Sequence, residues 1–267
     1  MPPKVPYTWR QPDYPGDGSE HRWIEPTMII FCQDADIEQS VEPLMRTLHE
    51  PIGIGPVASV FVHETMRERL IERVRNAMSV VHRKVKTHAH YKQALRRVDC
   101  LQAELVSMQQ PDDIGFRFSM VEGSPLVVCD FPQSFFSSQH PSTVVTLHTF
   151  RNLQELSELT ALEKLPFVSA AIWSPKMAAA YEIAMKLKLP VIYINCAAIS
   201  LAPVLAQYEA KQTVALIENN FHYEVLLLDN EIPKIIVYPA LLLLPAPPTP
   251  PKTSTVSLKK TATEQQE

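Results

Sequence analysis

Glycine is scarce in this chain, with six residues in 267. Nucleotide-binding enzymes use glycine-rich turns because the backbone must approach phosphate oxygens that a side chain would block. The only glycines before residue 50 are Gly16 and Gly18, and no strand or helix pattern surrounds them. We therefore expect no NAD or NADP site within this chain.

Cysteine is also sparse, and long apolar runs are missing. The cysteines are Cys32, Cys100, Cys129 and Cys196. Their wide spacing, without a Cys-x-x-Cys pair, is typical of reduced thiols rather than of disulfides or a zinc site. The longest apolar run, 240–246, is far shorter than the roughly 20 residues that span a bilayer, and the N-terminus has no signal-peptide core. We expect a cytoplasmic protein without membrane contact.

Positive charge is not in excess, since 25 Lys and Arg residues stand against 29 Asp and Glu residues, a net charge of −4. No overall basic field exists to attract nucleic acid, and we expect no nucleic-acid partner. Segment 82–92 is locally basic and has three histidines. We interpret it as a solvated loop between helices, because a metal site needs a defined fourth ligand. A weak surface for an anionic partner is the alternative left open.

Short apolar runs alternate with amphipathic segments through most of the chain. This order predicts βαβ units, and so an α/β fold with a largely parallel sheet in a three-layer sandwich. The expected strands are 27–32, 57–63, 124–131, 142–150, 167–174 and 190–196. The expected helices are 34–50, 64–81, 88–108, 152–165 and 175–189.

The two ends differ in composition from the middle. We expect a flexible leader at 1–19 and a proline-rich disordered tail at 245–267, because neither has enough apolar residues to form a core. Residues 20–200 form the expected main domain. The expected C-terminal strands lie in 201–244, with two of them in 222–244, and are a candidate oligomerisation element.

The order of these segments resembles the catalytic half of the aldehyde dehydrogenase superfamily. The similar pieces include "IIFCQDADIEQSVE", "VFVHETMRERLIERVRNA" and "VSAAIWSPKMAAAYEIAMKLKLPVIYIN", and together they cover about residues 20–200. The resemblance implies the fold of that catalytic domain in degenerate form, without the family's nucleotide-binding half.

In that family, the loop before strand 57–63 carries the cysteine that attacks the aldehyde. The matching positions here lie near Ile52, Gly53, Ile54, Gly55 and Pro56. None of them is cysteine, serine or threonine, so none can form the covalent adduct. The glycines are interpreted as loop geometry.

The other family roles are implied at four positions. Glu20 lies at a matching distance for the general base, but the glycines of that motif are lost, and we interpret it as a surface residue. Gln139 or a neighbour replaces the glutamate that holds the cofactor ribose. Asn195 matches an asparagine that helps to stabilise an oxyanion, although a turn role is equally expected. Cys196 is the best remaining nucleophile, although we favour a buried structural thiol.

These features predict a catalytically inactive remnant that acts as a binding or scaffolding subunit. The expected partner is a second copy of the chain or a full-length aldehyde dehydrogenase-type subunit. No cofactor is expected. The alternative is an enzyme, either an oxidoreductase that acts on aldehydes with NAD or NADP, or a weak thiol esterase that uses Cys196.

Overall fold

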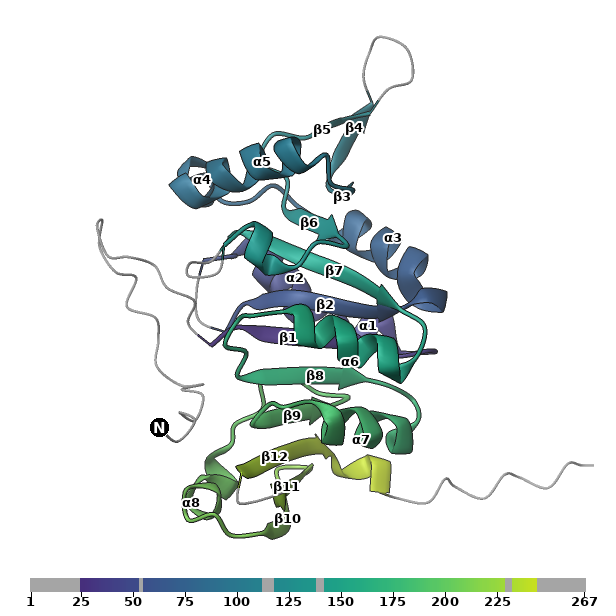
Figure 1. Ribbon diagram of the computed structural model, residues 1–267, viewed down its shortest axis with the longest axis vertical. Coiled ribbons are helices and arrows are strands. Elements are labelled where there is room, and N and C mark those ends of the chain that lie inside the picture. The colour runs from purple at the N-terminus through teal and green to yellow at the C-terminus, as the bar shows by residue number, and fades with distance from the viewer. Residues whose placement is uncertain (1–24, 53–54, 112–117, 138–141, 229–231, 244–267) are drawn as a thin grey trace, which may run out of the picture.

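A ten-stranded sheet forms the centre of the molecule (Figure 1), in a computed structural model that describes residues 25–52, 55–111, 118–137, 142–228 and 232–243. The strand order is β10-β11-β12-β9-β8-β1-β2-β7-β6-β3. The strands are β1 (Thr27–Phe31), β2 (Val57–His63), β3 (Leu105–Val106), β6 (Leu126–Cys129), β7 (Val144–Phe150), β8 (Ser169–Trp173), β9 (Val191–Ile194), β10 (Val214–Glu218), β11 (Phe221–Leu228) and β12 (Ile232–Pro239). A separate pair consists of β4 (Gln109–Pro111) and β5 (Phe118–Met120).

The sheet is parallel through its middle and antiparallel at both ends. Every neighbouring pair from β12 to β6 runs parallel. The pairs β10 with β11, β11 with β12, and β3 with β6 run antiparallel. The prediction of a largely parallel α/β sheet is confirmed.

Helices cover both faces of the sheet, as the alternating pattern predicted. The helices are α1 (Ile37–Ser40), α2 (Glu42–His49), α3 (Arg67–Ala77), α4 (Arg83–Thr87), α5 (Ala89–Leu101), α6 (Leu153–Leu162), α7 (Met177–Lys186) and α8 (Leu205–Glu209), with 3-10 turns η1 (Glu64–Met66), η2 (Gln133–Phe135), η3 (Ala202–Val204) and η4 (Ala240–Leu243). In Figure 1, α6 and α7 lie in front of the sheet, while α1 and α2 lie behind it.

Strand β1 shows why its sequence is apolar throughout. Ile29 and Phe31 belong to the core cluster shared with α1, α2 and α3, whereas Met28 and Ile30 belong to the cluster shared with α6 and α7. A strand that is buried on both faces has no polar alternation, as is typical of parallel sheets between two helical layers.

Three expected elements differ from the structure, each for a local reason. Helix 88–108 ends at Leu101, because Gln102 adopts a left-handed backbone with φ 49° and the chain then enters β3. Helix 34–50 is two helices, and α2 begins afresh with Pro43 in its first turn, where the missing proline N–H costs nothing. The loop expected at 82–92 contains α4, which the His82 side chain caps.

The late segment completes the sheet of its own chain. The two strands expected in 222–244 are confirmed as β11 and β12, and β10 precedes them unpredicted. Lys234 of β12 is buried, and its Nζ donates to the carbonyls of Ala184 and Leu187, each at 2.6 Å, at the end of α7. This contact joins the late strands to a helix of the main domain.

Both terminal predictions, the leader at 1–19 and the tail at 245–267, lie outside the described residues. Within the described ranges, none of the helices has the length and apolar character that crossing a membrane requires.

Candidate functional site

A cavity of about 340 Å³ lies beside the loop that precedes β2. Its sheet side includes Ile29, Ala171 and Tyr193, which all belong to the core cluster on the α1–α2 side of the sheet. Arg46 of α2 and Gly55 of the loop also line it. The cavity is therefore where the family resemblance places the chemistry, next to the nucleophile loop.

The loop itself offers no nucleophile among its described residues. Ile52, Gly55 and Pro56 are described, while Gly53 and Ile54 lie outside the described ranges. Gly55 has φ 66°, a left-handed conformation that favours glycine over residues with a Cβ. The Pro56 carbonyl accepts from the Thr27 N–H at 2.9 Å, which ties the end of the loop to β1.

Asn195 follows β9, and both ends of its amide are used by one neighbour. Its Nδ2 donates to the Ser174 carbonyl at 2.8 Å, and its Oδ1 accepts from the Ser174 N–H at 2.9 Å. The residue has φ 52°, which asparagine tolerates better than most residues. The amide connects the ends of β8 and β9, and this link uses one of the two Nδ2 hydrogens and fixes the direction of the other.

Cys196 is buried, with 7% of its surface exposed. Burial raises the pKa of its thiol to about 12, and its Sγ donates to the Val237 carbonyl at 3.4 Å. A thiol with this pKa is almost entirely protonated at neutral pH and is a weak nucleophile. Burial also raises the pKa of Cys32 and of Cys129 to about 11, while Cys100 is exposed on α5.

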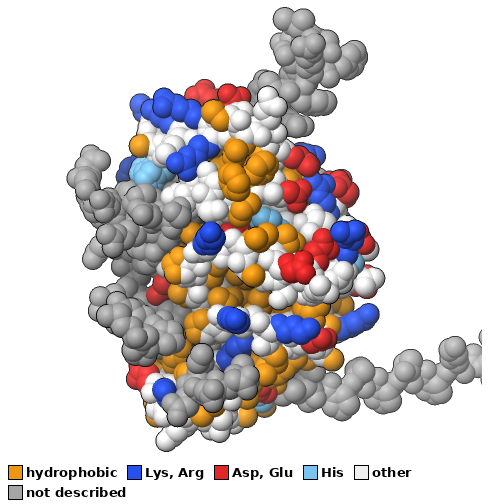
Figure 2. All heavy atoms as spheres, viewed as in Figure 1, with side chains coloured by type: hydrophobic (Ala, Val, Ile, Leu, Met, Phe, Trp, Pro, Cys, Tyr) orange, Lys and Arg blue, Asp and Glu red, His pale blue; other side chains and the backbone are white. Residues whose placement is uncertain are grey.

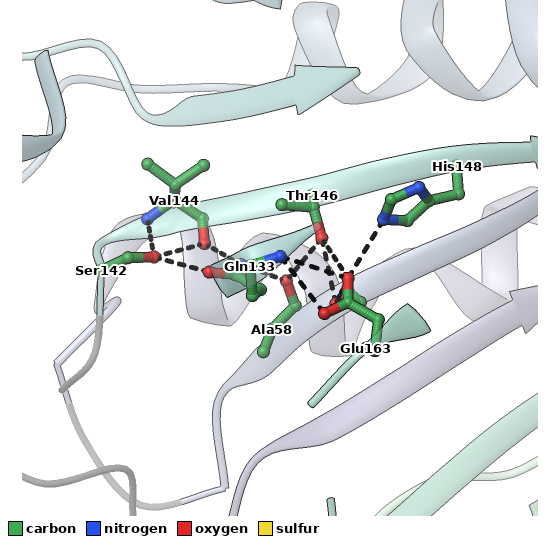
Figure 3. Close-up of polar contacts among 8 residues, drawn as sticks. Ala58, Gln133, Ser142, Val144, Thr146, His148 and Glu163 are labelled. Carbon is green, nitrogen blue, oxygen red and sulfur yellow. Dashed lines mark hydrogen bonds and ion pairs between the residues drawn. The ribbon is translucent and has the colours of Figure 1, made fainter. Parts of the chain in front are cut away.

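A second polar region, which the sequence analysis did not predict, is a buried network around Glu163 (Figure 3). The Glu163 side chain is fully buried. Its Oε1 lies 3.1 Å from His148 Nε2 and accepts from the Ser59 hydroxyl at 2.9 Å, and its Oε2 accepts from the Gln133 N–H at 3.2 Å. The Thr146 hydroxyl donates to Oε1 at 3.3 Å, so the carboxylate is well supplied with donors.

The same network links two strands to η2. Gln133 Nε2 donates to the carbonyls of Ala58 in β2 and Val144 in β7, at 2.6 and 2.7 Å. Its Oε1 accepts from the Ser142 hydroxyl at 2.9 Å. These bonds fix η2 against the buried backbone of both strands.

A serine, a histidine and a carboxylate occur together here, but not as a nucleophile with its base. The Ser59 hydroxyl donates to Glu163 rather than to His148, and both side chains are buried. Catalysis by a serine needs the hydroxyl beside the base and open to a substrate. The arrangement is a structural one. Its signal in the sequence is that Thr146 and His148 stand two residues apart in the buried strand β7 and so face the same side of the sheet.

The remaining predicted site residues, Glu20 and Gln139, lie outside the described ranges. Across the described residues, no group of three or more His, Cys, Asp or Glu side chains is placed to hold a metal ion.

Solved structures with a similar fold are aldehyde dehydrogenases. The Delta-pyrroline-5-carboxylate dehydrogenase from Mycobacterium tuberculosis matches with a TM-score of 0.50 at 10% identity, over 65% of this chain and 35% of that chain. A putative aldehyde dehydrogenase from Burkholderia cenocepacia matches with a TM-score of 0.49 at 18% identity, over 65% of this chain and 40% of that one. The match spans well under half of each of these longer chains. At such identities the likeness shows the fold alone, and it agrees with the resemblance found in the sequence.

Two further comparisons concern the sequence. No curated protein matches this chain. The family model described as "Protein of unknown function (DUF1487)" matches residues 22–244, which include every strand and helix of the described fold. Since the match covers most of the chain, this protein belongs to the DUF1487 family.

Proposed function

We propose that this protein is a catalytically inactive relative of the aldehyde dehydrogenase catalytic domain that acts as a binding or scaffolding subunit. One observation carries the proposal: no described position of the loop beside the cavity has a nucleophilic side chain, and the thiol nearest to that loop in the family pattern, Cys196, is buried. The loop positions Ile52, Gly55 and Pro56 have no reactive group, and the thiol of Cys196 is buried with its pKa raised to about 12. Covalent attack on an aldehyde needs a thiolate or an activated hydroxyl.

The free edge of the sheet supports association with another chain. Strand β10 pairs with β11 on one side and is the last strand of the described sheet on the other. Its Ile217 is 60% exposed. An edge strand presents unpaired N–H and C=O groups, which pair readily with a strand of another chain. A second copy of this chain, or a full-length aldehyde dehydrogenase-type subunit, is the partner that we propose.

The enzyme alternative is an oxidoreductase that acts on aldehydes with NAD or NADP, or a weak thiol esterase that uses Cys196. The cavity of about 340 Å³ beside the loop favours it, because that volume admits a small substrate. The buried thiol weighs against it.

Sedimentation velocity on the full chain, together with an assay of NADH or NADPH formation from aldehydes, tests the proposal. We expect an oligomer without turnover. Ile217→Lys places a charge on the β10 edge and should yield a monomer. Leu162→Lys is the matched control, since Leu162 is also 60% exposed but lies on α6, and it should leave the oligomer intact. A wild-type monomer at micromolar concentration, or cofactor reduction that Cys196→Ala abolishes, would overturn the proposal.

A further inference from the structure

One end of the molecule carries a concentrated positive charge within an acidic chain. Residues 73–98 contain eight Lys and Arg residues and no Asp or Glu. Because the whole chain has 25 basic and 29 acidic residues, the other residues hold 17 basic and 29 acidic ones, a net charge of −12. Such segregation of charge is a common mark of an interaction surface.

Four of these cations lie on α4 and α5, are exposed and make no ion pair with any residue that the structure describes. They are Arg83 and Lys84 on α4, and Lys92 and Arg96 on α5. Figure 2 shows Lys and Arg side chains gathered at the upper left of the molecule, where Figure 1 places α4 and α5. By contrast, Lys86 of the same segment pairs with Glu122 at 2.8 Å.

Packing of α5 holds these charges in place. Tyr91, Ala94 and Val98 are buried in a cluster with residues of β6 and β7, and the Tyr91 hydroxyl donates to the Ser124 carbonyl at 2.7 Å. This buried stripe turns Lys92 and Arg96 outward, four residues apart on one helix face. Like charges at this spacing repel each other, so the arrangement costs helix stability without any ion pair in return.

Two exposed apolar side chains lie close to α4 and α5 in the chain or in space. Phe135 is 51% exposed, and its carbonyl accepts from the Arg97 guanidinium at 3.3 Å, so it lies beside α5. Val80 is 50% exposed and precedes α4. We call Val80, Arg83, Lys84, Lys92, Arg96 and Phe135 the basic surface.

We propose that the basic surface binds an acidic segment of a partner protein, one in which Asp or Glu alternates with apolar residues. The carboxylates of such a segment pair with the four free cations, and its apolar residues cover Val80 and Phe135. A long nucleic acid is disfavoured, because it extends past the surface into the field of the remaining chain, whose net charge is −12. The segment is short enough to remain within the basic surface.

Fluorescence anisotropy with a labelled synthetic peptide of alternating Glu and Leu tests the proposal on the full chain. We expect saturable binding that weakens as salt is raised. The variant Arg83→Glu, Lys84→Glu, Lys92→Glu and Arg96→Glu should bind the peptide at least about tenfold more weakly. The neutral pair Lys92→Gln and Arg96→Gln tests the same surface with less risk to folding, and melting curves verify each variant.

The matched control replaces four other exposed cations by glutamate and so changes the net charge equally. These cations are Arg69, Lys164, Lys176 and Lys188. It should bind the peptide as the wild type does. An equal loss in both sets, or no binding of the peptide, would overturn the proposal. Tighter binding of single-stranded DNA, or of phosphatidylserine vesicles, than of the peptide would also overturn it.

Discussion

The cavity beside the nucleophile loop and the Glu163 network differ in opposite ways from a working active site. The cavity has room for a ligand, but none of its described lining residues is a cysteine. The network contains serine, histidine and carboxylate, but these side chains are buried and bond to one another. Catalysis needs reactive groups and access at one place, and our proposal of an inactive relative rests on their separation in this chain.

The difference also shows how polar residues are used in this sheet. At Asn195 and in the network, side chains pair with backbone groups of neighbouring elements and connect strands. Buried polar groups that are fully satisfied fix one arrangement of the core. We therefore predict that a substitution in either region alters the stability of the fold and leaves turnover unchanged.

The largest expected effect is from Glu163→Ala. The substitution removes the carboxylate that accepts from the Ser59 hydroxyl and the Gln133 N–H, and leaves both donors buried without that acceptor. We expect a loss of about 3 to 5 kcal/mol in the free energy of unfolding. That loss is a fall on the order of 10 °C in melting temperature, measured by calorimetry.

Glu158→Ala on the exposed face of α6 is the matched control for this loss. Its carboxylate accepts from Gln154 at the surface, so the change should stay within about 0.5 kcal/mol. If both variants have the melting temperature of the wild type, the network does not stabilise the fold.

A smaller effect is expected for Asn195→Ala. It removes two hydrogen bonds to the buried Ser174 and puts alanine at φ 52°, which together cost about 2 to 3 kcal/mol. Asn219→Ala shares the backbone strain, with φ 50°, but its side chain is exposed, so it should cost about 1 kcal/mol. Urea unfolding measures both. Equal losses in the two variants would show that the amide link to Ser174 contributes nothing.

The smallest expected effect is the change in melting temperature when NAD or NADP is added. The paucity of glycine predicts that neither NAD nor NADP shifts the melting temperature. A ligand at 100 times its Kd would add about 2.7 kcal/mol to the stability of the native state, a shift of several degrees. A reproducible shift of that size at millimolar cofactor would reveal a nucleotide site and would favour the oxidoreductase alternative.

The fold was more predictable from sequence than the site, for physical reasons. Strand β2 was expected at 57–63 and is found at Val57–His63, because apolar runs of strand length between helical patterns are a local signal. Strand β10 was missed although its sequence, VALIE, is mostly apolar, because the run is short and its pairing with β11 at the edge of the sheet is not visible in a single sequence.

The site depends on contacts between distant parts of the chain. Glu163 meets Ser59 across 104 positions, and Asn195 meets Ser174 across 21. A single sequence shows the residue types but not these pairings. From the sequence we favoured a buried structural thiol over a reactive one at Cys196. The structure adds the surroundings of this thiol: its Sγ donates to the Val237 carbonyl, and its burial raises its pKa.

Thiol labelling tests most directly the central claim that no reactive thiol lies beside the loop that precedes β2. At pH 8, a thiol with a pKa of about 12 is ionised in only about one molecule in ten thousand. With iodoacetamide on the native protein, and peptide mass spectrometry as the readout, we expect the exposed Cys100 to be alkylated first. Cys196 should stay unmodified until denaturant is added. Alkylation of Cys196 in the native protein as fast as that of Cys100 would contradict the account and support a thiol-dependent enzyme.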